Sequence, residues 1–137
     1  MVIKSLRAFI KELEKRGDLF RIEEEIDPKY EISGVLKILD EKDGPAVIFE
    51  NPKGYNIPVA GNLMGNRKRL AMAFGVEEKD LIKEYLQRKE NPMPPKVISE
   101  GPVKEIVIKD NIDIPGLFPV VTYSEKDSNP YIASGVL

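Results

Sequence analysis

The feature that most constrains the fold is a short apolar run at positions 46–49, with the sequence Ala-Val-Ile-Phe. Gly44 and Pro45 come before it, and the turn-forming sequence Asn-Pro-Lys-Gly at 51–54 comes after it. An uninterrupted run of this length is typical of a buried strand. The sequence therefore predicts an α/β (α+β) fold that contains such a strand.

Two amphipathic helices are expected before this strand, with a short strand at 19–24 between them. Ser5 can cap the first helix, and Gly17 suits a left-handed residue at its end. Asp27 is the expected N-cap of the second helix, with Pro28 at its first helical position. Apolar residues follow the helical spacing in both, at Leu6, Phe9, Ile10 and Leu13 and at Ile32, Val35, Leu36 and Leu39.

Two more helices are expected after a strand at 57–60. The third should begin near Asn66 and end at Gly75. The fourth has an acidic first turn and a basic last turn, which agrees with the helix dipole. The residues of these turns are Glu77 and Glu78, and Arg88 and Lys89. The side of this helix that faces the core should comprise Leu81, Ile82, Tyr85 and Leu86.

The pattern changes at residues 91–95, which are too rich in proline to continue a helix and suit a stiff connector. Strands are expected at 96–99 and 103–108, and a bend at 114–119. The apolar stretch 131–137 should form a last strand, whose sheet partners we expect outside this chain because no turn follows it. We therefore expect an N-terminal α/β domain at 1–95, with a mixed sheet and about four helices, and a β-rich connection at 96–137.

Composition excludes several classes of function. The chain has no Cys and no His, which removes disulfides, thiolate chemistry, the usual zinc ligands and the common nucleophilic triads. Its 21 basic and 23 acidic residues are interleaved, so a nucleic-acid partner is not indicated. It contains no apolar run long enough for a signal peptide or a membrane span, and we expect a cytoplasmic protein. The abundance of Glu, Lys and Ile suggests a thermophilic source.

The most unusual local feature is a group of cations at the start of the third helix, where the dipole disfavours positive charge. Asn66, Arg67 and Arg69 are therefore a candidate anion site, because helix-terminal N–H groups and Arg side chains together can bind phosphate or carboxylate. The alternative is that Arg67 and Arg69 pair with acidic residues of a neighbouring segment or subunit.

Other polar groups give weaker signals. The acidic run Glu23, Glu24, Glu25 and Asp27 could serve acid/base chemistry or bind a hard cation, but it also suits a solvated strand end and a helix cap. Asp40, Glu41 and Asp43 suit a solvent-facing helix end. Tyr123, Ser124 and Ser128 have no base beside them. No catalytic or metal-binding residue is predicted, although a Lys-based site stays open.

Several blocks resemble, in order, the N-terminal part of the UbiD family of decarboxylases. They cover nearly the whole chain, which makes the resemblance strong even though no single block is decisive. The blocks are 6–19, 26–28, 31–32, 44–46, 49–55, 58–63 with Gly65 and Arg67, and 127–132.

The resemblance implies an N-terminal α/β domain, a central split-barrel domain that binds prenylated flavin mononucleotide (FMN) with a divalent metal such as manganese and with potassium, and a C-terminal domain for oligomerisation. The implied reaction is reversible, non-oxidative decarboxylation of an unsaturated or aromatic acid. Family substrates include polyprenyl hydroxybenzoates, aromatic and cinnamic-type acids and, in archaea, a phosphorylated anhydromevalonate. Residues 131–137 resemble the first strand of the split barrel. The resemblance implies that the family's catalytic and metal-binding residues come after this strand.

No cofactor is therefore expected to bind this chain alone, and Ala133 and Ser134 form only a candidate pocket edge, with Ala133 where many relatives have Thr. Three roles stay open: an N-terminal fragment of the enzyme that is inactive alone, a stand-alone module that binds an anion or a partner, and one subunit of a split decarboxylase. The implied partners are the downstream domains or a complementary subunit, in a homo-oligomer when full length.

Overall fold

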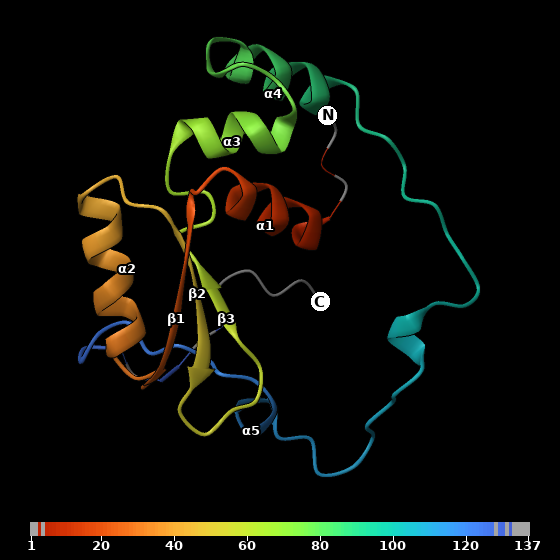
Figure 1. The fold of residues 1–137 in the computed structure, drawn as a ribbon. Coiled ribbons are helices and arrows are strands. Elements are labelled where there is room, and N and C mark those ends of the chain that lie inside the picture. The colour runs from red at the N-terminus through yellow and green to blue at the C-terminus, as the bar shows by residue number, and fades with distance from the viewer. Residues whose placement is uncertain (1–2, 4, 128, 131, 133–137) are drawn as a thin grey trace.

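The structure is a computed structural model that describes residues 3, 5–127, 129–130 and 132. It is a mixed α+β fold, as predicted, with a small sheet and helices placed around it (Figure 1). The elements are α1 (Leu6–Lys15), β1 (Leu19–Ile26), α2 (Glu31–Glu41), β2 (Ala46–Pro52), β3 (Val59–Gly61), α3 (Arg67–Phe74), α4 (Leu81–Glu90) and α5 (Ile114–Leu117), with 3-10 turns at Glu78–Asp80 and Pro102–Lys104.

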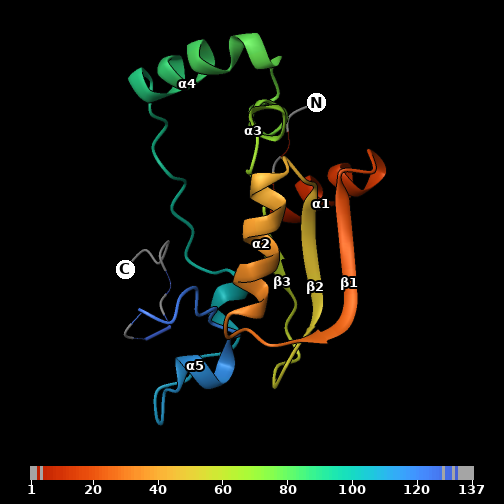
Figure 2. The ribbon, with the colours of Figure 1, turned by 90° about the vertical axis from the view of Figure 1, so that its left-hand side faces the viewer.

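The sheet has the order β1-β2-β3, so the predicted buried strand is its centre. β1 and β2 run parallel with Leu19 opposite Ala46, and α2 makes the crossover between them. β3 pairs antiparallel to β2, with Val47 opposite Gly61. Figure 2 shows α2 along one face of the sheet. The first four residues of β2 are buried, which confirms the expectation from their apolar run.

Two apolar clusters form the core. The first fills the space between the sheet and α2 and is centred on Ile26, Ile32, Val47 and Phe49. Its fifth buried member is Val121, from a distant part of the chain. The second cluster joins α1 to the N-terminal end of β2 through Phe9, Leu13 and Ala46.

The predicted caps of α1 and α3 are confirmed. The Ser5 hydroxyl accepts the Ala8 N–H at 3.2 Å, and the Asn66 side chain accepts the Arg69 N–H at 2.9 Å. Gly17 and Gly75 follow these helices with φ of 69° and 75°, in the left-handed region where glycine is favoured.

The predicted start of α2 is wrong by three residues. The helix begins at Glu31 rather than at Pro28, and Tyr30 precedes it with φ of 75°. The Asp27 carboxylate accepts the Lys29 N–H at 2.7 Å, and Glu31 accepts the Asp27 N–H at 2.7 Å. Asp27 therefore stabilises a turn before the helix instead of capping it.

The strands predicted at 96–99 and 103–108 do not form. Residues 91–113, which we call the arm, run as an extended segment away from the rest of the protein (Figure 1), interrupted by the turn Pro102–Lys104. In the described chain the arm has no neighbouring strand, so its backbone cannot enter a ladder. Residues 131 and 133–137 of the predicted last strand lie outside the described residues.

Beyond α5, the chain returns to the sheet domain in a segment that we call the strap, residues 119–123. Thr122 donates to Pro28 O and accepts from the Tyr30 N–H, both at 3.1 Å. Nearby, the Tyr55 hydroxyl donates to Pro115 O at 2.7 Å. Since Val121 also enters the first apolar cluster, the strap belongs to the packing of the N-terminal domain.

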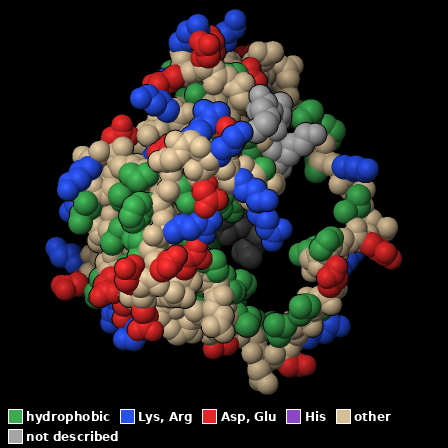
Figure 3. Space-filling model, in the orientation of Figure 1, with side chains coloured by type: hydrophobic (Ala, Val, Ile, Leu, Met, Phe, Trp, Pro, Cys, Tyr) green, Lys and Arg blue, Asp and Glu red, His purple; other side chains and the backbone are tan. Residues whose placement is uncertain are grey.

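Figure 3 shows hydrophobic side chains along the arm, which stands apart from the body of the molecule.

Within the described residues, no helix combines the length and the apolar character required to cross a bilayer.

Candidate functional site

The N-terminus of α3 lies where three loops meet, and Asn66 organises it. Its side-chain oxygen caps the helix through the Arg69 N–H, and its amide donates to the Asp43 carboxylate at 3.1 Å. Nearby, the Asn62 amide donates to the carbonyls of Gly44 and Pro45 at 3.0 and 2.9 Å. These bonds fix the loop after α2 against the start of α3.

Arg69 is the buried cation of this site, with a relative exposure of 2%. One end of its guanidinium donates to the Asp18 carboxylate at 2.9 Å, and the other donates to Gly44 O at 3.0 Å. Its Nε has no hydrogen-bond partner among the described residues. Asp18 therefore compensates the buried charge of Arg69, which the helix dipole disfavours.

Arg67 and Lys68 differ from Arg69 because they are exposed. The Arg67 Nε lies 3.6 Å from a Glu78 oxygen, and about half of each side chain is accessible to water. With Asn66, Lys68 and Asp43, these residues line a shallow pocket. Both arginines thus pair with acidic residues of neighbouring segments, which agrees with the alternative weighed for them. Anion binding at Asn66, Arg67 and Arg69 stays a prediction.

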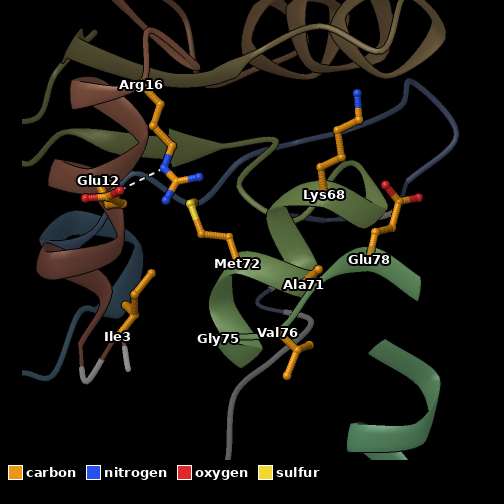
Figure 4. A pocket seen from close by; sticks show the side chains of 9 residues that line it. All are labelled: Ile3, Glu12, Arg16, Lys68, Ala71, Met72, Gly75, Val76 and Glu78. Carbon is orange, nitrogen blue, oxygen red and sulfur yellow. Dashed lines mark hydrogen bonds and ion pairs between the residues drawn. The ribbon is translucent and has the colours of Figure 1, made fainter. Parts of the chain in front are cut away.

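A second pocket, of about 260 Å³, lies between α1 and α3 (Figure 4). The Arg16 Nε donates to Glu12 Oε1 across one turn of α1, at 2.7 Å. This bond lowers the pKa of Glu12 below its ordinary value. The lining combines these charges with those of Lys68 and Glu78 and with apolar groups, namely Ile3, Ala71, Met72 and Val76, beside Gly75.

The acidic run of β1 lies along an exposed strand, consistent with the solvated interpretation. Arg21 bridges Glu14 and Glu50 across this surface, and the hydrogen bonds that it donates to both carboxylates raise its pKa. In the described part of the chain, no three His, Cys, Asp or Glu side chains group together as a metal site.

The acidic residues at the end of α2, Asp40 and Glu41, are exposed, in agreement with the predicted solvent-facing helix end.

The partner of Arg69 was not found by sequence analysis. The unfavourable cations signalled that some compensation was needed, but Asp18 lies 51 residues away in the chain. The only related signal was the prediction that a helix ends at Gly17, the residue before Asp18. Ala133, Ser134 and Ser128 lie outside the described residues.

Comparison with known proteins identifies the relatives of this fold. Residues 10–89, more than half of the chain, match the family model of the 3-octaprenyl-4-hydroxybenzoate carboxy-lyase N-terminal domain. The UbiD-class enzyme HmfF from Pelotomaculum thermopropionicum, solved as an evolved dimeric form with prenylated FMN, is similar with a TM-score of 0.86 and 35% identity. That alignment covers 93% of this chain and 30% of HmfF.

Two aromatic-acid decarboxylases are similar over the same region. Vanillic acid decarboxylase from Sedimentibacter hydroxybenzoicus gives a TM-score of 0.81 at 32% identity, covering 93% of this chain and 30% of its own. The 3,4-dihydroxybenzoic acid decarboxylase from Enterobacter cloacae gives 0.82 at 26% identity, covering 95% and 30%. This chain thus spans about 30% of the length of these relatives. The family match and the shared fold together show that the chain belongs to the UbiD family of carboxy-lyases, as its N-terminal domain.

Proposed function

We propose that this chain is the architectural N-terminal domain of a UbiD-type carboxy-lyase, and that it supplies no reacting group itself. In this role it packs against the flavin-binding domain and helps to shape the cleft in which the acid substrate binds. The complete enzyme would catalyse non-oxidative decarboxylation, or the reverse carboxylation, of an unsaturated or aromatic acid.

The observation that carries this proposal is the apolar surface of the arm. Large hydrophobic side chains of the arm are exposed over more than half of their surface, namely Met93, Val97, Ile98, Val103, Ile106, Val107, Ile108 and Ile112. So many exposed apolar side chains on one segment are unfavourable in water and mark a protein interface. A second domain laid against the arm would bury it and could supply the strands that its backbone lacks.

The names of the relatives support the substrate class. Vanillic acid and 3,4-dihydroxybenzoic acid are aromatic carboxylates, and the family description names a polyprenyl hydroxybenzoate. We therefore place aromatic acids first, with anhydromevalonate phosphate as the alternative if the source is archaeal. The dimeric form of HmfF supports a homo-oligomer for the complete enzyme.

The family cofactor, prenylated FMN with a divalent metal and potassium, requires a cation-rich or amide-rich pocket for its phosphate. In the described part of the chain, the pockets beside α3 combine their cations with the carboxylates of Glu12, Asp43 and Glu78. These negative charges oppose a phosphate, so the residues do not fit the cofactor. The proposal therefore places the flavin and its metals in another part of the complete enzyme and assigns no chemical step to these residues.

Complementation tests the proposal. This chain is mixed with a separately expressed polypeptide that contains the flavin-binding and C-terminal domains, with prenylated FMN, manganese and potassium present. We expect carbon dioxide release from an aromatic acid only in the mixture. Activity of the downstream polypeptide alone would leave this domain without a required role, and activity of this chain alone would contradict the proposal.

A matched pair of variants tests the arm specifically. Ile106→Asp changes an exposed arm residue, and Ile38→Asp changes an exposed residue of α2. We expect the first to abolish complementation and the second to leave it intact, with both chains folded as the parent by circular dichroism. Equal complementation by the two variants would show that the arm is not the docking surface.

A further inference from the structure

The outer face of α4 is not explained by the fold. The sequence predicted that Leu81, Ile82, Tyr85 and Leu86 would all face the core, but only Leu81 is buried, against α3. Ile82, Tyr85 and Leu86 keep 58%, 52% and 49% of their surface exposed. These three large apolar side chains form a stripe along α4 that the described residues leave about half exposed, with the Tyr85 ring also in contact with Phe74 of α3 at 6.4 Å between centroids.

The arm, which follows α4 directly, does not cover this stripe. Met93, the first large apolar residue after the helix, is itself 91% exposed. The stripe extends into a groove between α3 and α4 whose lining contains Leu70, Phe74 and Tyr85. The surface is therefore apolar across both helices.

The charges at the two ends of the stripe are opposite. Glu78, Ile82, Tyr85 and Lys89 follow one another at spacings of four, three and four residues, which is the seam spacing of a two-helix coiled coil. Glu78 stands in the turn that leads into α4, and Lys89 stands in its last turn. Glu78 makes only a loose 3.6 Å pair with Arg67, and Lys89 makes no ion pair with the described part of the chain.

This pattern is complementary to itself in one orientation only. If a second copy of α4 lies antiparallel, Glu78 of each copy faces Lys89 of the other, while Ile82 and Tyr85 meet at the centre. The helix dipoles then also oppose each other favourably. A parallel arrangement would place Glu78 beside Glu78 and Lys89 beside Lys89, which is repulsive.

We propose that the α4 stripe is an interface between two copies of this chain, paired antiparallel about a two-fold axis between Ile82 and Tyr85. The contact is small, so association should be weak, with a dissociation constant on the order of 0.1–1 mM for the 137-residue chain. It would act together with any interface that other domains contribute, and it does not depend on the proposed role in catalysis.

Sedimentation equilibrium over a range of protein concentrations tests the apolar centre of the stripe. Ile82→Glu should weaken self-association by more than about tenfold, because it places a charge in the contact. Ile38→Glu is the matched control, since Ile38 lies on α2 with a similar exposure of 52%, and it should leave association unchanged. A chain that is monomeric at about 1 mM would overturn the proposal.

Charge exchange tests the orientation. In the Lys89→Glu variant, Glu78 faces a second glutamate, and in the Glu78→Lys variant, Lys89 faces a second lysine, so each variant alone should associate less than the parent. A mixture of the two variants pairs opposite charges at both ends and should form a heterodimer about tenfold more strongly than either homodimer.

Variants that associate as strongly as the parent would overturn the antiparallel pairing, because a parallel pair already opposes like charges in the parent. Equal association of the mixture and the separate variants would show that the charged ends do not contact each other at all. Association that persists in Ile82→Glu but disappears when the chain ends at Thr122 would also overturn it, because the contact would then lie in the C-terminal segment.

Discussion

Arg69 joins three segments that are distant in the sequence and meet only in the folded chain. Its guanidinium contacts Asp18 before β1 and Gly44 after α2, while its backbone N–H is bound by the cap residue Asn66. A buried ion pair contributes little compared with an apolar replacement, but an isolated buried charge is strongly unfavourable. The consequence is that the buried Arg69 depends on Asp18, whereas Asp18 is 38% exposed and is also solvated by water.

We predict that Asp18→Asn destabilises the domain by about 2–4 kcal/mol, because it leaves the Arg69 charge buried without its counter-ion. Glu78→Gln is the matched control, since it removes the same charge from the exposed and longer pair with Arg67, and it should change the free energy of unfolding by less than about 1 kcal/mol. Urea unfolding followed by circular dichroism gives both values. Equal losses in the two variants would show that Arg69 is adequately solvated without Asp18.

Glu12 should titrate below the ordinary range because Arg16 donates to its carboxylate. A depressed pKa in the folded state contributes stability above the unfolded pKa, and this contribution is lost as the pH falls through the folded pKa. We predict that Arg16→Gln raises the pKa of Glu12 towards the ordinary value of a glutamate side chain. Side-chain carboxyl NMR shifts followed from pH 7 to pH 2 test this, and identical midpoints in both proteins would contradict it.

At the scale of single elements, the sequence predicted a helix end correctly where one cap or one glycine determines that end through neighbouring backbone groups. Ser5, Gly17, Asn66 and Gly75 all occupy their predicted places, because their roles depend on neighbouring backbone groups. Asp27 failed as a cap because Asp27 bonds within its own turn and Thr122 binds the backbone on both sides of Lys29, at Pro28 and Tyr30. No local pattern reveals that tertiary contact.

The arm failed as a pair of strands for a related reason. The β-branched residues at 103 and 106–108 favour an extended backbone, and the backbone is extended over much of the arm. A strand also needs a partner, and the described residues provide none there. Similarly, the residue spacing in the sequence correctly identified the apolar face of α4. The prediction that this whole face is buried was wrong, because burial depends on which residues pack against the face.

Two glycines test the backbone argument with the same substitution. Gly17 has φ of 69° and Gly34 lies inside α2, and a Cβ added at either would meet no atom within 4 Å. We predict that Gly17→Ala destabilises by about 1 kcal/mol and that Gly34→Ala stabilises by about 0.5–1 kcal/mol. Thermal unfolding of both variants measures the difference. Changes of the same sign would mean that backbone conformation is not the deciding factor.

At the scale of the whole molecule, the strap changes how the chain is divided. The sequence suggested a domain at 1–95 and a connection from 96 onwards, and that boundary stays a prediction. Val121 nevertheless packs among Ile26, Ile32, Val47 and Phe49 in the core of the sheet domain. The stability of the N-terminal part therefore includes a contribution from residues beyond the arm.

We predict that Val121→Ala lowers the free energy of unfolding of the whole domain by about 1–2 kcal/mol, because it removes buried methyl groups from the core. Val103→Ala is the matched control in the arm, where the side chain is 88% exposed, and it should have an effect within about 0.5 kcal/mol. Denaturant unfolding distinguishes them. A neutral Val121→Ala variant would show that the strap is dispensable to the domain.

The attachment of the strap has a consequence for the arm. Residues 91–113 are fixed at one end by α4 and near the other by the strap and the Tyr55 to Pro115 bond, so the arm is a closed loop rather than a free tail. Closing a loop of this length has already removed chain entropy worth roughly 3 kcal/mol. A domain that binds the arm therefore restricts a chain whose freedom was reduced beforehand, and cutting the arm at one point should weaken that binding without removing a single contact residue.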